Sequence, residues 1–371
     1  MTLPSTATGV LTIDLGALAA NWRFLNARAA PARAAAVIKA NGYGLGIERV
    51  AAALFEAGCR MFFVAHPDEG ARARKILPGE VPIYVLNGLQ AHADAAGDYA
   101  AHGLRPTIGS EEELARLAEV NRDGVKLPFA LHLDTGMNRL GFESLEALEA
   151  AVARHGAHGA TLLMSHFVSA EVAGDPLTTA QFERFARARA RFSDVPAALA
   201  NSAGIFVSGT SFDWVRAGYA LYGGNPTPDA PNPMQAVAAL DVLVQQTRWI
   251  EAGESAGYNA RWTARRRTRL ATLLAGYADG LPFGAGGTDA RPGASALIAG
   301  QRCPLVGRIS MDLLIADVTD VPEPQVGAGA WARLFGPDLP LDDFASASGV
   351  IGYQVLTTLG PRYARVYKEA P

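Results

Sequence analysis

Residues 34 to 217 of this chain alternate between short apolar runs, typical of buried strands, and longer stretches with helical periodicity. The runs expected to form strands are residues 34–39, 61–65, 81–86, 105–108, 127–133, 160–166, 197–200 and 212–216. The clearest expected helices are residues 47–57, 111–121, 145–155 and 178–191, and Ser110 precedes Glu113 at the spacing of a helix-capping pair. This alternation indicates parallel strands joined by crossover helices, and eight strand–helix units fit a (β/α)8 TIM barrel. An open, doubly wound sheet is the alternative fold.

The pattern changes after residue 223, where a turn-rich segment of glycine, asparagine and proline ends near Pro233. β-type runs follow at residues 237–250, 269–274, 296–298, 305–309 and 313–318, and one short helix is expected at 342–347. The predicted fold class is therefore an α/β barrel plus a β domain. We expect the barrel to occupy residues 11–233, and a mostly-β domain to comprise residues 234–371 together with the N-terminal segment 1–10.

Composition excludes several classes of protein. With 49% hydrophobic and 19% charged residues, the chain is expected to fold rather than to be disordered. A net charge of -3 provides no basic surface for nucleic acid or for a membrane. Cys59 and Cys303 cannot build a disulfide framework, and no CxxC pair suggests a metal site. No apolar run reaches the roughly 18 residues that span a bilayer, and residues 1–5 do not resemble a signal peptide, so a cytoplasmic protein is expected.

Reactive side chains follow several of the expected barrel strands. The first strand ends at Lys39, which is followed by three glycines within seven residues; Arg139 follows the fifth strand and His166 the sixth. Catalytic groups of such barrels gather at the C-terminal ends of the strands, so these three side chains are candidates for an active site. Each also has a plainer interpretation: a lysine that extends from a strand end to solvent, a surface ion pair, and a packed structural histidine.

The segments after the last two strands are typical of a phosphate site. Ser202 and backbone N–H groups near Gly204, Gly218 and Tyr219 offer uncharged donors to a phosphate dianion, although ordinary turn glycines are the alternative. Lys39 is a candidate for a Schiff base with an aldehyde. An amine, a phosphate cradle, an arginine and a histidine around one rim together indicate pyridoxal 5'-phosphate.

These segments, in this order, resemble alanine racemases, which are pyridoxal-phosphate enzymes of fold type III with a barrel and a β domain. The resemblance runs from residue 13 to the C-terminus and is carried by residues 37–46, 134–141, 165–167, 201–204 and 216–223. It implies that Lys39 binds the cofactor and is one of two catalytic bases, and that Tyr43 contacts the phosphate. Ser202, Gly204, Gly218 and Tyr219 would complete the phosphate site. Arg216 would face the pyridine nitrogen, with His166 beside it.

The resemblance also places the second base, Tyr258, in the β domain. In the family this tyrosine enters the site from the partner subunit, which implies a homodimer with shared active sites. Met311 and Asp312 would bind the substrate carboxylate together with Arg139, and Tyr353 would lie at the entrance to the cofactor pocket. His132 stands where many members of the family have a lysine, seven residues before Arg139.

The activity implied is the interconversion of L-alanine and D-alanine, which would supply D-alanine for peptidoglycan. A broader amino-acid or serine racemase on the same scaffold is one alternative. A non-catalytic pyridoxal-phosphate carrier or regulator is another, but such a protein needs no β domain.

Overall fold

The computed structural model describes residues 6–92, 95–122, 124 and 126–369. The chain divides into two compact units. The barrel unit comprises Leu18–Leu221 and Asn225–Met234. The β unit comprises the described residues up to Ala17, Tyr222–Gly224, and those from Gln235 onward.

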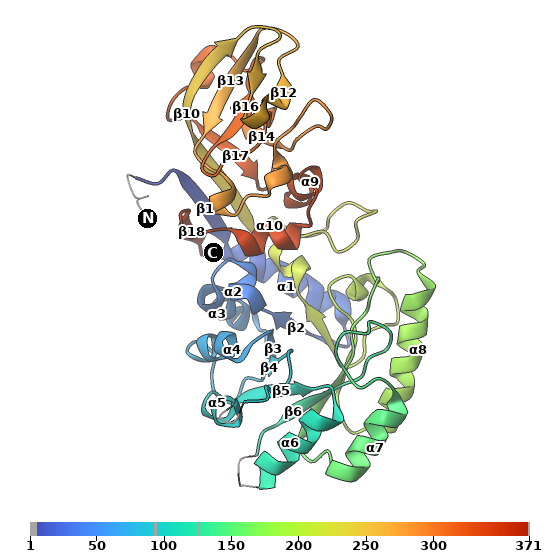
Figure 1. The fold of residues 1–371 in the computed structure, drawn as a ribbon. Helices are drawn as coiled ribbons and strands as arrows, with labels where there is room; N and C mark the ends of the chain where they lie inside the picture. The colour runs from blue at the N-terminus through green and yellow to red at the C-terminus, as the bar shows by residue number, and fades with distance from the viewer. Residues whose placement is uncertain (1–5, 93–94, 123, 125, 370–371) are drawn as a thin grey trace. The chain divides into compact units, whose positions relative to one another are not determined.

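The barrel unit contains eight parallel strands that close into a barrel (Figure 1). The barrel closes because the last strand pairs with the first, with Ala34 opposite Val215 and Ala36 opposite Ala217. This closure confirms the predicted TIM barrel and excludes the open sheet, whose two edge strands would not meet. In order around the barrel, the strands are β2 (Arg33–Val37), β3 (Phe62–Val64), β4 (Ile83–Val85), β5 (Leu104–Ile108), β6 (Phe129–His132), β7 (Ala160–Met164), β8 (Ala197–Ala198) and β9 (Trp214–Ala217).

The helices between these strands begin at local capping signals. Ser110 Oγ accepts the N–H of Glu113 (3.2 Å), as the sequence predicts. Asp175 accepts the N–H of Leu177 (2.8 Å) with Pro176 next to it, so the helix expected at 178–191 starts two residues earlier. The helices from the N-terminus to the end of the barrel are α1 (Leu15–Ala29), α2 (Lys39–Tyr43), α3 (Ile47–Ala57), α4 (Pro67–Arg74), α5 (Ala95–Ala101), α6 (Glu111–Arg122), α7 (Leu145–His155) and α8 (Pro176–Arg191).

The β unit is built on one sheet whose strand order is β15-β14-β17-β10-β1-β18, with β13 paired to β10 and β16 paired to β13. β10 is long enough to pair with three strands, and its register shifts between Val244 and Gln246. The strands are β1 (Gly9–Asp14), β10 (Ala238–Ile250), β13 (Thr268–Leu273), β14 (Ser295–Ile298), β15 (Gln301–Pro304), β16 (Leu314–Asp317), β17 (Trp331–Phe335) and β18 (Ala364–Lys368), and a separate pair is formed by β11 (Ser255–Ala256) and β12 (Trp262–Thr263). The unit is thus mostly β, as predicted, and its helices are α9 (Leu341–Ala347) and α10 (Gly352–Thr358).

Short 3-10 turns complete both units and carry several residues of interest. They are η1 (Gly204–Phe206), η2 (Tyr219–Tyr222), η3 (Tyr258–Ala260), η4 (Tyr277–Asp279), η5 (Phe283–Ala285) and η6 (Glu323–Gln325).

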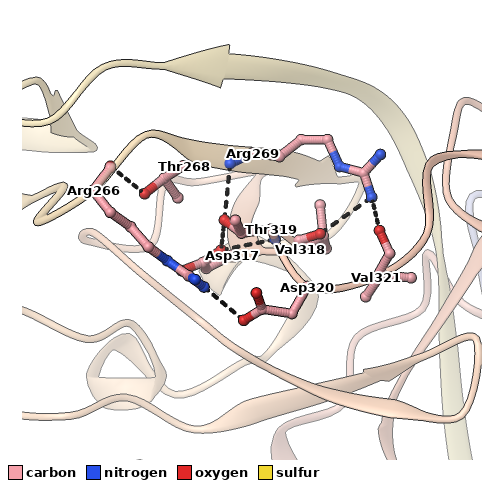
Figure 2. A network of polar contacts seen from close by, with 8 residues as sticks. All are labelled: Arg266, Thr268, Arg269, Asp317, Val318, Thr319, Asp320 and Val321. Atoms are coloured by element: carbon pink, nitrogen blue, oxygen red, sulfur yellow. Dashed lines mark hydrogen bonds and ion pairs between the residues drawn. The ribbon is translucent and has the colours of Figure 1, made fainter.

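A polar network fixes the loop after β16 against β13 (Figure 2). The buried side chain of Arg269 donates to the carbonyl oxygens of Val318 (3.1 Å) and Val321, and its own N–H donates to Thr319 Oγ1 (2.9 Å). Arg266 pairs with Asp320 (2.6 Å) at the exposed edge of the network. The Arg269 side chain thus provides donors to two backbone carbonyl oxygens of this loop.

The part of the chain that the structure describes lacks two features. None of its helices combines the length and the apolar character needed to cross a membrane. No group of three or more His, Cys, Asp or Glu side chains in it is arranged to hold a metal ion.

Candidate active site

The first barrel strand leads into a left-handed turn. The strand was expected to reach Lys39, but β2 ends at Val37 and Lys39 begins α2. Ala40, Asn41 and Tyr43 have φ of 52°, 57° and 53°, which is the left-handed region. L-residues pay about 1–2 kcal/mol each for this conformation, so surrounding contacts must hold the turn.

The Lys39 amine lies in a partly buried position at the end of the strand. Burial lowers the pKa of this amine below its ordinary value of 10.5, and the positive charge of Arg139 lowers it further, whereas the Glu69 carboxylate raises it. The net lowering favours the neutral amine, the form that can attack a carbonyl carbon or accept a proton.

Arg216 is buried at the end of β9 and is held from several sides. Its Nη1 donates to the carbonyl oxygen of Ala198 (2.7 Å), and its Nη2 donates to the carbonyl oxygen of Ser165 and to His166 Nδ1 (3.0 Å). Burial lowers the pKa of the guanidinium to about 10, so it stays positively charged at neutral pH. The structure therefore places a rigid, charged donor in the wall of the barrel.

The contact with Arg216 determines where the His166 proton resides. A guanidinium can only donate, so Nδ1 of His166 accepts and Nε2 carries the proton of the neutral ring. Burial lowers the pKa of His166 well below 6.5, and the charges of Arg216 and Arg139 act in the same direction. His166 is thus a neutral donor through Nε2.

His132 is the last residue of β6, and the charges of Arg216 and Arg139 act on its imidazole as well. Burial lowers its pKa to about 4, the charge of Arg216 adds to this effect, and the carboxylate of Asp134 opposes it. Arg139 lies farther along the loop that follows, and its side chain is exposed. The loop is closed at its base, because the N–H of Phe142 donates to the His132 carbonyl oxygen (2.8 Å).

Three groups suited to a phosphate come together from separate parts of the chain. Ser202 Oγ, after β8, accepts the N–H groups of Gly218 (2.9 Å) and Ala220 (3.3 Å), after β9. A Cβ added to Gly218 would lie 2.8 Å from Tyr43 Oη, so the Tyr43 hydroxyl reaches the same point from α2. The two hydroxyls are uncharged donors of the kind that a phosphate dianion binds, and the Gly218 amide beside them donates to Ser202 Oγ in this structure.

The other two residues predicted for the phosphate site follow the same strands. Gly204 begins η1, its N–H donates to Asn201 Oδ1 (2.9 Å), and an added Cβ would meet the Phe167 ring at 2.9 Å. Tyr219 begins η2 directly after Gly218 and is buried. Packing against Phe167 is therefore sufficient to explain why position 204 is a glycine.

Tyr258, Met311, Asp312 and Tyr353 all belong to the β unit, where their side chains are exposed. Tyr258 is 66% exposed and Met311 53% exposed. The segment of Tyr258 lies against residues 307–308, because a Cβ on Gly257 would stand 2.8 Å from the Arg308 nitrogen. Asp312 Oδ1 accepts a hydrogen bond from Arg362 (2.8 Å).

Sequence reasoning missed Glu69, whose Oε1 accepts the N–H of Ala40 at 2.6 Å. The run Pro67-Asp68-Glu69 is a sequence signal for the start of a helix, and α4 does begin at Pro67. The partner of the carboxylate lies 29 residues upstream, however, and no local pattern indicates that pairing.

Comparisons with known proteins cover nearly the whole chain. The family model described as "Alanine racemase, N-terminal domain" matches residues 13–226, and the one described as "Alanine racemase, C-terminal domain" matches residues 237–367. An alanine racemase of Methylobacterium nodulans is 53% identical over 372 residues, which cover 100% of this chain and 98% of that protein.

Solved structures of this family share the fold. The crystal structure of alanine racemase from Bartonella henselae with covalently bound pyridoxal phosphate superposes with a TM-score of 0.90 at 36% identity, and covers 98% of this chain and 100% of that one. Biosynthetic alanine racemase from Pseudomonas aeruginosa gives a TM-score of 0.87 at 34% identity, with coverage of 98% and 100%.

Proposed function

Because the chain belongs to the alanine racemase family, we propose that it is an isomerase that interconverts L-alanine and D-alanine with pyridoxal 5'-phosphate. The observation that carries this proposal is the cluster at the ends of the barrel strands. A lysine with a lowered pKa, a buried arginine and an uncharged phosphate cradle meet there, in a chain that matches the family in both of its domains.

The residues present fit this cofactor. Ser202 Oγ accepts the Gly218 N–H, and a side chain at position 218 would collide with Tyr43 Oη, so both hydroxyls lie close to Gly218. We assign the phosphate to these groups together with Gly204 and Tyr219, and the aldehyde to the Lys39 amine. When bound, the cofactor supplies an electron-withdrawing ring that stabilises negative charge at the α-carbon of an amino acid.

Arg216 is proposed to face the pyridine nitrogen. It can offer that nitrogen a hydrogen bond but not a proton, because the guanidinium remains charged well above neutral pH. Its contacts with the Ala198 and Ser165 carbonyl oxygens fix the direction of the side chain. The arginine thereby limits how strongly the ring can withdraw electrons, which disfavours side reactions of the carbanion.

Racemisation needs one base on each face of the α-carbon, because a proton removed from one face must be replaced on the other. We assign one face to the neutral amine of Lys39 and the other to the phenolic oxygen of Tyr258. His166 carries its proton at Nε2, and we propose that this N–H donates to the phenolic oxygen and so favours proton removal from Tyr258.

We propose that the enzyme is a homodimer in which the partner's β unit completes each site. Tyr258, Met311 and Tyr353 are exposed on the β unit, which leaves them available to a second subunit. In this arrangement Arg139 and the Met311 amide bind the substrate carboxylate. Asp312, which pairs with Arg362, orients the loop that carries Met311.

The proposed role in the cell is to supply D-alanine for peptidoglycan, and the proposed location is the cytoplasm. Both Cys59 and Cys303 are free and buried, which suits a reducing compartment. A broad racemase and a carrier are not favoured. A carrier in particular would not account for the match of residues 237–367 to the family's C-terminal domain.

The test is to incubate the cofactor-loaded protein with each alanine enantiomer in deuterated water, and to follow α-deuterium and optical activity. The wild-type enzyme should invert alanine with deuterium uptake. Lys39→Ala should abolish the reaction, and Tyr258→Phe should lower inversion by about 10²–10⁴-fold while the cofactor still binds. Tyr99→Phe, which removes the hydroxyl that donates to the Gly88 carbonyl oxygen, is the control and should keep its turnover.

Three results would contradict parts of this proposal. Absence of exchange in the wild type would reject the racemase function. Unchanged turnover in Tyr258→Phe would reject the role of that residue. Equal turnover of L-serine and L-alanine would replace the alanine racemase with a broad racemase.

A further inference from the structure

The carboxylate of Glu69 joins the ends of two neighbouring barrel strands. Its Oε1 accepts the N–H of Ala40 (2.6 Å), the peptide nitrogen that directly follows Lys39. Its Oε2 accepts the N–H groups of Ala65 (2.8 Å) and His66 (3.3 Å), which follow β3. One half-buried side chain thus connects the residue after Lys39 to the adjacent strand.

The turn that Glu69 holds is energetically unfavourable by itself. Ala40, Asn41 and Tyr43 are non-glycine residues in the left-handed region, and together they cost several kcal/mol, at about 1–2 kcal/mol each. Lys39 lies directly before this stretch and Tyr43 at its end. Any relaxation of the turn would therefore change the direction of the Lys39 amine and the position of the Tyr43 hydroxyl together.

A second contact from the same helix supports the turn. Arg72 lies three residues after Glu69 on α4 and donates through Nη2 to Asn41 Oδ1 (2.7 Å), which also accepts the N–H of Ile47 (3.1 Å). Arg72 is itself held by two hydrogen bonds to Glu48, of 2.8 and 3.0 Å. Residues three apart lie on the same face of a helix, so α4 contacts the turn through two neighbouring side chains, Glu69 and Arg72.

We propose that Glu69, assisted by Arg72, is a positioning residue that holds the left-handed turn and thereby aims the Lys39 amine. The inference rests on the role of Lys39 in the proposed function. Glu69 touches neither substrate nor cofactor in this proposal; it acts through the backbone of Ala40. Its negative charge also opposes the lowering of the Lys39 pKa.

We call such a carboxylate link between two strand ends a brace, and the chain contains a second one that serves as a matched control. Glu113 occupies the equivalent third position of α6, and its carboxylate accepts the N–H groups of Gly109 (2.7 Å) and Leu89 (3.0 Å). It joins the segments after β4 and β5 as Glu69 joins those after β2 and β3, but neither Gly109 nor Leu89 is next in the chain to a residue assigned to the reaction. Glu113→Gln therefore reports what the loss of such a brace does to the fold alone.

The experiment compares Glu69→Gln with Glu113→Gln in the cofactor-loaded enzyme and in the cofactor-free protein. Both variants should lower the thermal midpoint. Glu69→Gln should lower kcat for alanine about ten- to a hundredfold with KM within about threefold of wild type, as expected for a misaligned reacting group. Glu113→Gln should keep kcat within about twofold. In cofactor-free Glu69→Gln, amide hydrogen exchange over residues 39–46 should be faster than in wild type, and Glu113→Gln should leave it unchanged.

Arg72→Gln serves if Glu69→Gln does not fold. The Arg72 side chain is 42% exposed, so the variant should fold, and it should lower kcat in the same pattern by a smaller factor. The proposal is wrong if Glu69→Gln and Arg72→Gln lower kcat no more than Glu113→Gln does, or if exchange over residues 39–46 stays at the wild-type rate. Absence of racemisation in the wild type would instead reject the proposed function, while the exchange comparison would still test the brace.

Discussion

His132 and His166 are neutral imidazoles on which the buried cation Arg216 acts. His132 and His166 both have pKa values below the ordinary histidine range because they are buried and because Arg216 repels a second positive charge. Arg216 is the cation in direct contact with His166, and four protein acceptors surround its guanidinium. The protonation of Arg216 is thus fixed, and both histidines remain neutral as the pH varies around 7.

This arrangement predicts a pH dependence of stability. The pKa of His132 is about 4 in the folded protein and 6.5 in an unfolded chain. Between these values the unfolded state binds a proton that the folded state does not, so the free energy of unfolding falls as the pH is lowered from 6.5 towards 4 and is unaffected above 6.5. His166 acts in the same direction, and each histidine contributes a slope of at most about 1.4 kcal/mol per pH unit.

His132→Asn should remove its share of this slope. The measurement is urea unfolding of the cofactor-free protein at a series of pH values between 4 and 8, for the wild type and the variant. His158→Asn, at an exposed position, controls for the loss of a histidine as such. Parallel pH profiles for the wild type and His132→Asn would contradict the assignment.

At the scale of single residues, the candidate groups that the sequence offered lie close to glycine-rich motifs. Lys39 and Ser202 were predicted from such motifs and Arg216 from the family resemblance, and the structure brings Ser202 together with Tyr43 and Gly218. Glu69 escaped prediction because its importance lies in a contact 29 residues away. A hydrogen bond between distant backbone and side-chain atoms leaves no periodicity in the sequence.

At the scale of elements, the predicted end of the first strand was wrong for a physical reason. The apolar run from residue 34 to Ile38 is typical of a strand, which was predicted to end at Lys39. β2 instead ends at Val37, although the Ile38 N–H still donates to the Phe63 carbonyl oxygen (2.8 Å), and the backbone becomes left-handed from Ala40 onward. Gly42 and Asn41 are residue types that adopt such angles, but Ala40 and Tyr43 are not, and tertiary contacts rather than propensity hold these two there.

The close approach of Gly218 to Tyr43 gives a prediction at this scale. An added methyl group would lie 2.8 Å from Tyr43 Oη, and the buried ring has little room to move, so Gly218→Ala should displace the hydroxyl. Loss of one hydrogen bond to a charged group, worth about 1.5–3 kcal/mol, should weaken cofactor binding roughly tenfold or more. The measurement is the equilibrium binding of pyridoxal 5'-phosphate to the cofactor-free protein.

Gly97→Ala is the matched control for the Gly218→Ala substitution. Gly97 lies in α5 and has open space around an added Cβ, so the variant should bind the cofactor like wild type and be slightly more stable. Equal cofactor affinity in Gly218→Ala and Gly97→Ala would show that the Tyr43 hydroxyl does not contribute to the phosphate site.

At the scale of the whole molecule, the alternation of strands and helices was enough to predict a barrel followed by a β domain. It could not predict the pairings within the β unit. There β1, near the N-terminus, lies between β10 and β18, and its residue Leu11 is opposite both Leu240 and Arg365. Such long-range pairings depend on how separate strands complement one another, which a single sequence does not encode as a local pattern.

The division into two units permits a direct test of whether each active site is shared between subunits. Lys39 belongs to the barrel unit and Tyr258 to the β unit. If Tyr258 comes from the partner, a heterodimer of a Lys39→Ala chain and a Tyr258→Phe chain contains one site in which both residues are wild type. Purified by two different affinity tags, this heterodimer should show about half of the wild-type activity, although each parent homodimer is inactive.

The reciprocal heterodimer makes the result unambiguous. A wild-type chain paired with a chain that carries both Lys39→Ala and Tyr258→Phe should be inactive, because the intact Lys39 then faces the altered tyrosine and the intact Tyr258 faces the altered lysine. If each site were instead built from one chain, the activities would be exchanged: the first heterodimer would be inactive and the second would show about half of the wild-type activity. The pair of measurements therefore assigns the second base to a subunit without depending on the absolute rate of the enzyme.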